Sequence, residues 1–142
     1  MPAVTPSVTL PKAGAAIAVA VAANTALFAT ARAVGEDFTV VKDGGATTVT
    51  ASSVVMMTVV SLVVGFGAAA LTARAWPAGL RLAAPVGAAL TVLSLTLLPS
   101  ADAPAATKLW ITALHLVVGT AYVAGLLIPD RSHRPLWHTG RA

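Results

Sequence analysis

Four long apolar stretches dominate the chain, and the last of them constrains the fold most. It covers residues 109–128 and contains no formal charge. An α-helix of about 20 residues crosses the ~30 Å hydrocarbon core of a bilayer. The other three stretches cover residues 13–34, 54–72 and 82–98. We therefore predict an all-α membrane protein with one domain over residues 1–142, built as an up-down bundle of four transmembrane helices with tails at 1–12 and 129–142.

The composition agrees with a lipid environment and excludes several classes of function. The chain is 57% hydrophobic and 10% charged, whereas soluble domains carry about 25% charged residues. It has no cysteine, which excludes disulfides, thiolate metal sites and a four-span thiol oxidoreductase. The nine Lys and Arg residues form no basic run. We therefore expect the lipid bilayer as a partner and no nucleic acid.

The first apolar stretch has two interpretations. Ala29-Thr30-Ala31 resembles the small-x-small site at which a signal peptide is cleaved. The apolar run is longer than a usual signal core, and only Lys12 precedes it after a proline-rich lead. We favour a retained first span, with cleavage as the alternative.

The connections between the spans carry turn and cap signals. Two β-prone runs flank Asp43-Gly44-Gly45, and Asp-Gly favours a tight hairpin turn. We predict a short extracytoplasmic β-hairpin between the first two spans; an irregular loop is the alternative. Asp102 and Thr107 are expected to cap the fourth helix, and Pro85 is expected in the first turn of the third, where a missing N–H costs little.

Counting basic residues gives the orientation. One side of a four-span chain would hold six of them: Lys12, Arg74, Arg81, Arg131, Arg134 and Arg141. The other side would hold Arg32, Lys42 and Lys108. Because cytoplasmic loops carry the excess of Lys and Arg, we predict a multi-pass protein of the cytoplasmic (inner) cell membrane with both termini in the cytoplasm.

Small and polar residues recur at helical spacing in each span. The stripes are Asn24, Phe28 and Arg32 in the first span; Thr58, Ser61, Gly65, Ala68 and Thr72 in the second; Gly87, Thr91 and Ser94 in the third; and Lys108, Thr112, His115, Gly119 and Tyr122 in the fourth. Small residues let membrane helices approach closely, and Ser, Thr and Asn bond across the interface. Helix packing alone accounts for most of this pattern.

An ionisable side chain within a span suggests a site. His115 lies about 10 Å below the outer end of its helix, at ~1.5 Å per residue, and a group at that depth is expected to face protein or water. The candidate binding pocket, open to the outer face, comprises Asn24, Arg32, Asp102, Trp110, His115 and Tyr122. The candidate catalytic groups are His115, Glu36 and Asp37. The structural alternative is that Asn24, Tyr122 or a backbone carbonyl satisfies the imidazole.

Two functional hypotheses follow. The first is an envelope accessory or binding protein that takes a hydrophobic or amphipathic small molecule, a membrane-protein partner or a second copy of itself. The alternative is an intramembrane enzyme, of isomerase or cyclase type, that uses proton transfer on a hydrophobic substrate. No metal-ligand pair occurs at helical spacing, so neither a metal nor a cofactor is expected. A proton-coupled transporter is disfavoured because no acidic residue lies within a span.

Three sequence features carry a resemblance to a known type of protein. They are Asn24, the loop entry Gly35-Glu36-Asp37-Phe38, and the run Leu114-His115-Leu116-Val117-Val118. With four spans around them, the chain resembles an uncharacterised family of small four-helix membrane proteins from high-GC bacteria. The resemblance covers residues 13–129 and implies a four-helix membrane fold without an assigned activity.

Overall fold

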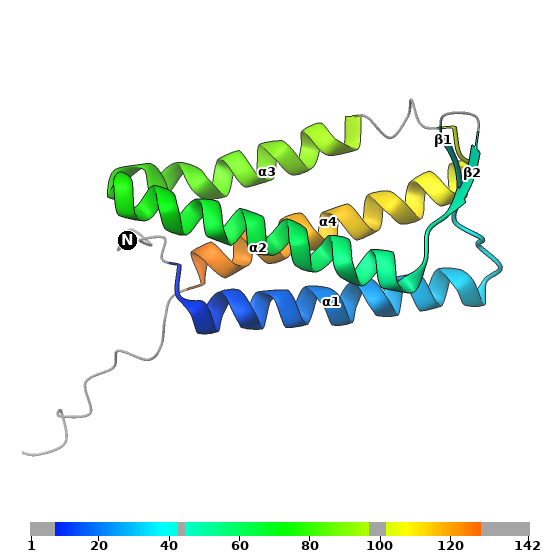
Figure 1. The fold of residues 1–142 in the computed structure, drawn as a ribbon, viewed down its shortest axis with the longest axis horizontal. Helices are drawn as coiled ribbons and strands as arrows, with labels where there is room; N and C mark the ends of the chain where they lie inside the picture. Colours follow the sequence, from blue (N-terminus) through cyan, green and yellow to red (C-terminus); the bar gives the residue numbers. More distant parts are fainter. Residues whose placement is uncertain (1–7, 43–44, 97–101, 129–142) are drawn as a thin grey trace, which may run out of the picture.

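Four long helices, alternating in direction, make up most of the protein (Figure 1). The structure, a computed structural model, describes residues 8–42, 45–96 and 102–128. The helices are α1 Leu10–Ala33, α2 Ala51–Ala75, α3 Leu80–Thr96 and α4 Ala105–Leu127. Each is long and apolar enough to cross a membrane, the third when taken with the 3-10 turn η1 (Pro77–Gly79) that precedes it. The prediction of four apolar, membrane-length helices is therefore confirmed.

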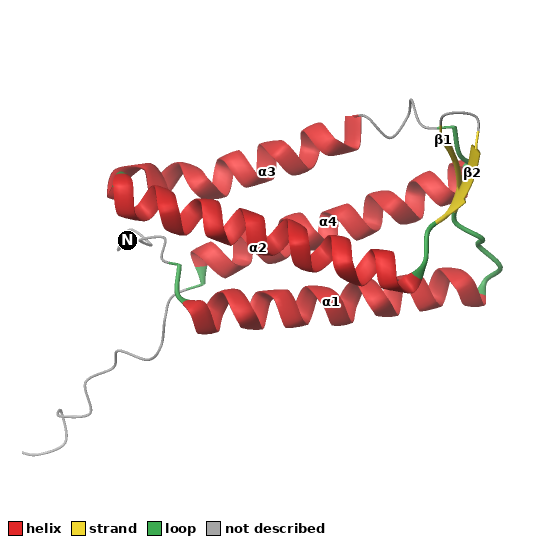
Figure 2. Cartoon of the chain, in the orientation of Figure 1, coloured by secondary structure: helices red, strands yellow, loops and turns green. Residues whose placement is uncertain are grey.

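The protein has two distinct ends (Figure 2). One end, here called the hairpin end, carries the strands β1 (Thr39–Lys42) and β2 (Gly45–Thr48). They pair antiparallel, with Thr39 opposite Thr48, so the predicted hairpin is present; its turn residues 43–44 lie outside the described residues. The opposite end, the η1 end, holds the start of α1 and the turn between α2 and α3. The basic tail 129–142 also lies outside the described residues.

Local sequence signals explain where the helices begin and end. Gly35, at φ +88°, takes the left-handed position after α1. The Glu36 N–H then donates to the Ala31 carbonyl at 3.0 Å, the long bond of a Schellman motif. Thr50 and Ser53 form a reciprocal capping box at the start of α2. Because of this capping box, α2 begins at Ala51, three residues before residue 54, where the apolar run predicted the span to begin.

Two expectations about helix termini are wrong. Pro85 does not lie in the first turn of α3: the helix begins at Leu80, which places Pro85 inside it. Neither Asp102 nor Thr107 caps α4: Pro104 is the N-cap residue and makes no side-chain cap bond. The Asp102 carbonyl instead accepts from the Val41 N–H at 2.9 Å, which ties strand β1 to the entry of α4.

The helices pack unevenly. α1 packs along both α2 and α4, and α3 packs along α4, whereas α2 and α3 make few contacts with each other. Two buried clusters result, the larger around Leu62, Phe66 and Leu126 and the smaller around Phe28 and Phe38 at the hairpin end.

The outward faces of the helices remain apolar. On every helix a large aliphatic side chain is more than half exposed, for example Val19, Val63, Val92 and Leu109. A helix that is apolar all round is suited to hydrocarbon and not to water. The arrangement therefore fits a multi-pass membrane protein.

A single aromatic ring separates α2 from α3. The Tyr122 ring of α4 has Gly65 of α2 against one edge and Gly87 of α3 against the other. A Cβ at position 65 would lie 3.1 Å from that ring, and one at position 87 would overlap it. The neighbouring Phe66 ring lies 5.3 Å away, centroid to centroid. The two glycines therefore let a large side chain lie between two helices that would otherwise meet.

This contact predicts an asymmetric response to two identical substitutions. Gly87→Ala should lower the free energy of unfolding by about 1–3 kcal/mol, because overpacking forces neighbouring backbones apart. Gly67→Ala, on α2, meets nothing within 4 Å and should change stability by less than about 0.5 kcal/mol. Reversible unfolding in detergent micelles measures both. Equal stabilities for the two variants would contradict the placement of Tyr122.

Candidate functional site

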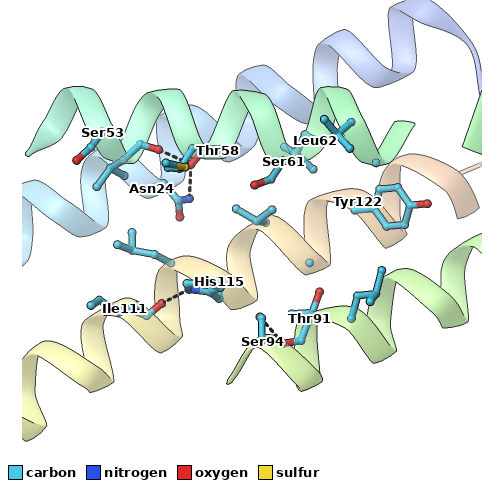
Figure 3. A pocket seen from close by; sticks show the side chains of 18 of the residues that line it. Asn24, Ser53, Thr58, Ser61, Leu62, Thr91, Ser94, Ile111, His115 and Tyr122 are labelled. Carbon is cyan, nitrogen blue, oxygen red and sulfur yellow. Dashed lines mark hydrogen bonds between the residues drawn. The ribbon is translucent and has the colours of Figure 1, made fainter. Parts of the chain in front are cut away.

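A groove of about 850 Å³ lies between α2 and α3 (Figure 3). Its floor is α4, which contributes His115, Gly119 and Tyr122. The hairpin end of the groove is bordered by β2 and the residues that follow it, from Thr47 to Thr50. We call this space the α2–α3 groove. It exists because α3 packs on α4 and stays apart from α2.

The small and polar stripes of three helices face this groove. Thr58, Ser61, Gly65 and Ala68 come from α2; Gly87, Thr91 and Ser94 from α3; and His115, Gly119 and Tyr122 from α4. Close packing accounts for the glycines: a Cβ at Gly119, for example, would lie 2.5 Å from the Thr91 hydroxyl oxygen. Thr58, Ser61, Thr91, Ser94 and His115 also line the groove.

An amide from α1 reaches the groove wall. Asn24 is 2% exposed, and its Nδ2 donates to the Thr58 Oγ1 at 2.8 Å. The Thr58 hydroxyl in turn donates to the Val54 carbonyl at 2.8 Å, so its oxygen is available as the acceptor. This chain of bonds fixes the orientation of the amide. The other amide atom, Oδ1, is enclosed and has no hydrogen-bond partner among the described residues.

The imidazole of His115, on α4, lines the groove (Figure 3). Its Nδ1 lies 2.9 Å from the Ile111 carbonyl oxygen. A carbonyl only accepts, so Nδ1 carries the proton. In the neutral ring Nε2 then has a lone pair available to the groove. The sequence offered a backbone carbonyl as one possible partner of His115, and the structure has that partner.

The carboxylates named as candidate catalytic groups lie elsewhere. Glu36 Oε1 accepts from the Thr107 hydroxyl at 2.6 Å and from the Phe38 N–H at 3.1 Å. Thr107 is fully buried, so Glu36 joins the α1–β1 loop to the first turn of α4. Asp37 lies 3.1 Å from the Arg32 guanidinium in an exposed ion pair. Neither carboxylate lines the α2–α3 groove.

Phe38 completes this connection at the hairpin end. It is a non-glycine residue at φ +53°, a backbone conformation that costs about 1–3 kcal/mol. Its fully buried ring stacks on Phe28 with centroids 4.8 Å apart. The Val49 N–H donates to its carbonyl at 3.1 Å. The Gly35–Phe38 motif therefore has a structural role, holding the hairpin against the helices.

The structure divides the predicted pocket into two groups. Asn24, His115 and Tyr122 line the groove together. Arg32, Asp102 and Trp110 do not: the first two lie with the loops of the hairpin end, and Trp110 packs against the cluster of Phe28 and Phe38.

Sequence reasoning left several groove residues out of the pocket. Thr58, Ser61, Thr91 and Ser94 line the groove, yet their stripes are also what helix packing produces. The helical spacing was the only signal available for them. Among the described residues, no cluster of three or more His, Cys, Asp or Glu side chains could hold a metal ion.

Comparison with protein families identifies a match over residues 5–132, to a family of unknown function, DUF6069. The chain belongs to DUF6069. This membership confirms the resemblance to an uncharacterised family, while the bacterial origin implied by that resemblance stays a prediction. Neither the curated proteins nor the solved structures contain a match to this DUF6069 member.

The Glu36 contact predicts a difference between two substitutions in this DUF6069 member. Both donors bond the same atom, Oε1, and a glutamine retains one oxygen that can accept from both. Glu36→Ala should lower the free energy of unfolding by about 1–3 kcal/mol, because a buried hydroxyl and an N–H lose their acceptor. Glu36→Gln should lose less than half as much. Unfolding in micelles compares them, and equal losses would contradict the shared-oxygen geometry.

Proposed function

We propose that this DUF6069 member is a binding protein of the cytoplasmic membrane, an envelope accessory protein that holds a hydrophobic or amphipathic molecule in the α2–α3 groove. The observation that carries the proposal is the groove itself. Its volume of about 850 Å³ is within the range of ~300–1,000 Å³ typical of small-molecule sites. It combines aliphatic walls with a few polar groups on the floor and sides.

The position of the groove supports a ligand that comes from the bilayer. The groove lies between two helices that are apolar and long enough to span a membrane. Leu90 of α3 borders it and is 59% exposed. An opening between such helices faces hydrocarbon, so an apolar molecule can enter without crossing water.

The enzyme alternative depends on His115. An imidazole in a groove is a candidate acid or base, and this placement is the observation that favours the alternative. The described residues that line the groove include no Asp, Glu, Lys or Arg, and Glu36 and Asp37 are engaged at the hairpin end. Proton transfer would then rely on His115 alone or with the Tyr122 hydroxyl. A bound molecule needs only the shape and polarity of the groove, and we therefore place binding first.

A pair of tryptophan variants tests groove binding. Leu90 lines the groove, whereas Leu93, on the same helix and 58% exposed, does not. With a long-chain alcohol carrying a mid-chain diazirine, saturable photolabelling of α2 and α4 should fall at least fivefold in Leu90→Trp, because the indole fills the groove. Leu93→Trp should label like the parent. Mass spectrometry of the labelled peptides measures this.

The contradictory result is equally clear. Labelling that rises linearly with probe concentration, or that both variants reduce equally, would indicate contact with the lipid-facing surface and no groove site. The folded state of both variants is checked by their circular dichroism and elution volume.

We further propose that the helices form an up-down four-helix bundle in the membrane, with the η1 end and both termini in the cytoplasm. Among the described residues, the η1 end carries Lys12, Arg74 and Arg81 and no acidic residue. The described acidic residues, Glu36, Asp37 and Asp102, all lie toward the hairpin end. Each end carries three described basic residues, with Arg32, Lys42 and Lys108 toward the hairpin end. The Lys and Arg excess expected of a cytoplasmic side comes from Arg131, Arg134 and Arg141, which follow α4 in the sequence.

The orientation can be tested directly because the chain has no cysteine. Ala46 of β2 and Ala78 of η1 are both exposed alanines. In intact cells a membrane-impermeant maleimide should modify Ala46→Cys and leave Ala78→Cys unmodified until the cells are lysed. The reverse pattern would overturn the proposed orientation. Labelling of both cysteines from outside would contradict the placement of the two ends on opposite sides of the membrane.

A further inference from the structure

We infer that the molecule held in the α2–α3 groove is an uncharged hydrophobic compound whose polar end is a hydroxyl group, a lipid alcohol in chemical class. The inference rests on the proposed binding function and deepens it. It is drawn by comparing the groove atoms that already form hydrogen bonds within the protein with those that can still bond a ligand.

Among the described residues that line the groove, none is Lys, Arg, Asp or Glu. With the His115 ring neutral, these residues offer no opposite charge to a charged head group. A carboxylate or phosphate brought into such a place would lose its hydration without gaining a cation, and an ammonium group would gain no carboxylate. The polar end of the ligand is therefore neutral.

The first acceptor available to a ligand is the imidazole. Because the Ile111 carbonyl at 2.9 Å takes the Nδ1 proton, the neutral ring presents Nε2 as an acceptor. The His115 side chain is exposed in the described structure, so a ligand reaches it without displacement of the helix. A hydroxyl donor is the complementary group.

The second acceptor is the unpartnered amide oxygen of Asn24. The residue is 2% exposed and lines the groove, and its Oδ1 has no partner among the described residues. Leaving a buried acceptor unsatisfied costs about 1–3 kcal/mol. Because Oδ1 is enclosed, a ligand reaches it after a small movement of the side chains around it. The amide then offers a site that only a donor can satisfy.

The hydroxyl groups of α3 also act as acceptors for a ligand. Thr91 donates its proton to the Gly87 carbonyl at 2.9 Å, and Ser94 donates to the Thr91 carbonyl at 2.7 Å. Their protons are used in these bonds, and each oxygen can still accept a hydrogen bond. Thr58 is engaged similarly with Val54. Ser61 and Tyr122 can both donate and accept, so the balance of the groove favours a donor.

Three matched probes test the inference on the full-length protein in phosphatidylcholine vesicles. They share one saturated C16 chain with a mid-chain diazirine and end in a primary alcohol, its methyl ether or a carboxylate. The alcohol should label groove residues about threefold to tenfold more strongly than the ether, the fold-change that corresponds to one net hydrogen bond. The ether is the deciding control, because it accepts hydrogen bonds but cannot donate.

A variant tests whether the preference for the alcohol over the ether depends on the His115 imidazole. His115→Phe keeps a ring of similar shape and removes the acceptor, and should reduce alcohol labelling to the level of the ether while leaving ether labelling unchanged. Ser61→Ala, on the α2 wall, should retain the alcohol preference. A His115→Phe variant that keeps the full preference would overturn the assignment to Nε2.

The outcomes separate this inference from the proposed function. Equal, saturable labelling by the alcohol and the ether, abolished by Leu90→Trp, would leave groove binding intact and overturn the hydroxyl inference. Stronger labelling by the carboxylate would overturn it as well. No saturable labelling by any of the probes would overturn both proposals.

Discussion

The position of the Tyr122 ring decides the shape of the protein. The ring lies between two glycines, Gly65 on α2 and Gly87 on α3. Had either position carried a larger residue, the ring would have to leave or the helices would have to part. In the described structure the ring lies between the two helices, and α2 and α3 diverge toward the hairpin end (Figure 1). The groove is thus a consequence of packing at one end of the molecule.

At the hairpin end, a set of hydrogen bonds and ring contacts holds the helices in place. The buried Thr107 hydroxyl and Glu36 link α4 to the loop after α1. The left-handed backbone of Phe38 places its ring on Phe28, and the Val41 N–H joins the hairpin to the entry of α4. These contacts fix α1, α4 and the hairpin to one another. The wall formed by α3 is held mainly through α4, which leaves the side toward α2 open.

Much of this arrangement follows from the sequence, and the remainder does not for identifiable reasons. Long apolar stretches predict the four helices, and the residues around Asp43 predict the hairpin. The capping box of Thr50 and Ser53, which lies outside the apolar run, explains why the start of α2 was placed too late. Helical spacing identifies the polar stripes, but the same spacing serves close packing and an open groove alike. Which one occurs depends on the angle between α2 and α3, and that angle has no local sequence signal.

The strands of the hairpin lie across one end of the groove, where Thr47 to Thr50 border it. Toward the η1 end, the Tyr122 ring lies between Gly65 and Gly87. Under the proposed binding function, a compound would enter the groove laterally, from the lipid. Occupancy would then follow the mole fraction of the compound in the membrane and not its aqueous concentration. For sparingly soluble compounds the bilayer would act as the reservoir, so that a weak intrinsic interaction suffices to keep the site filled.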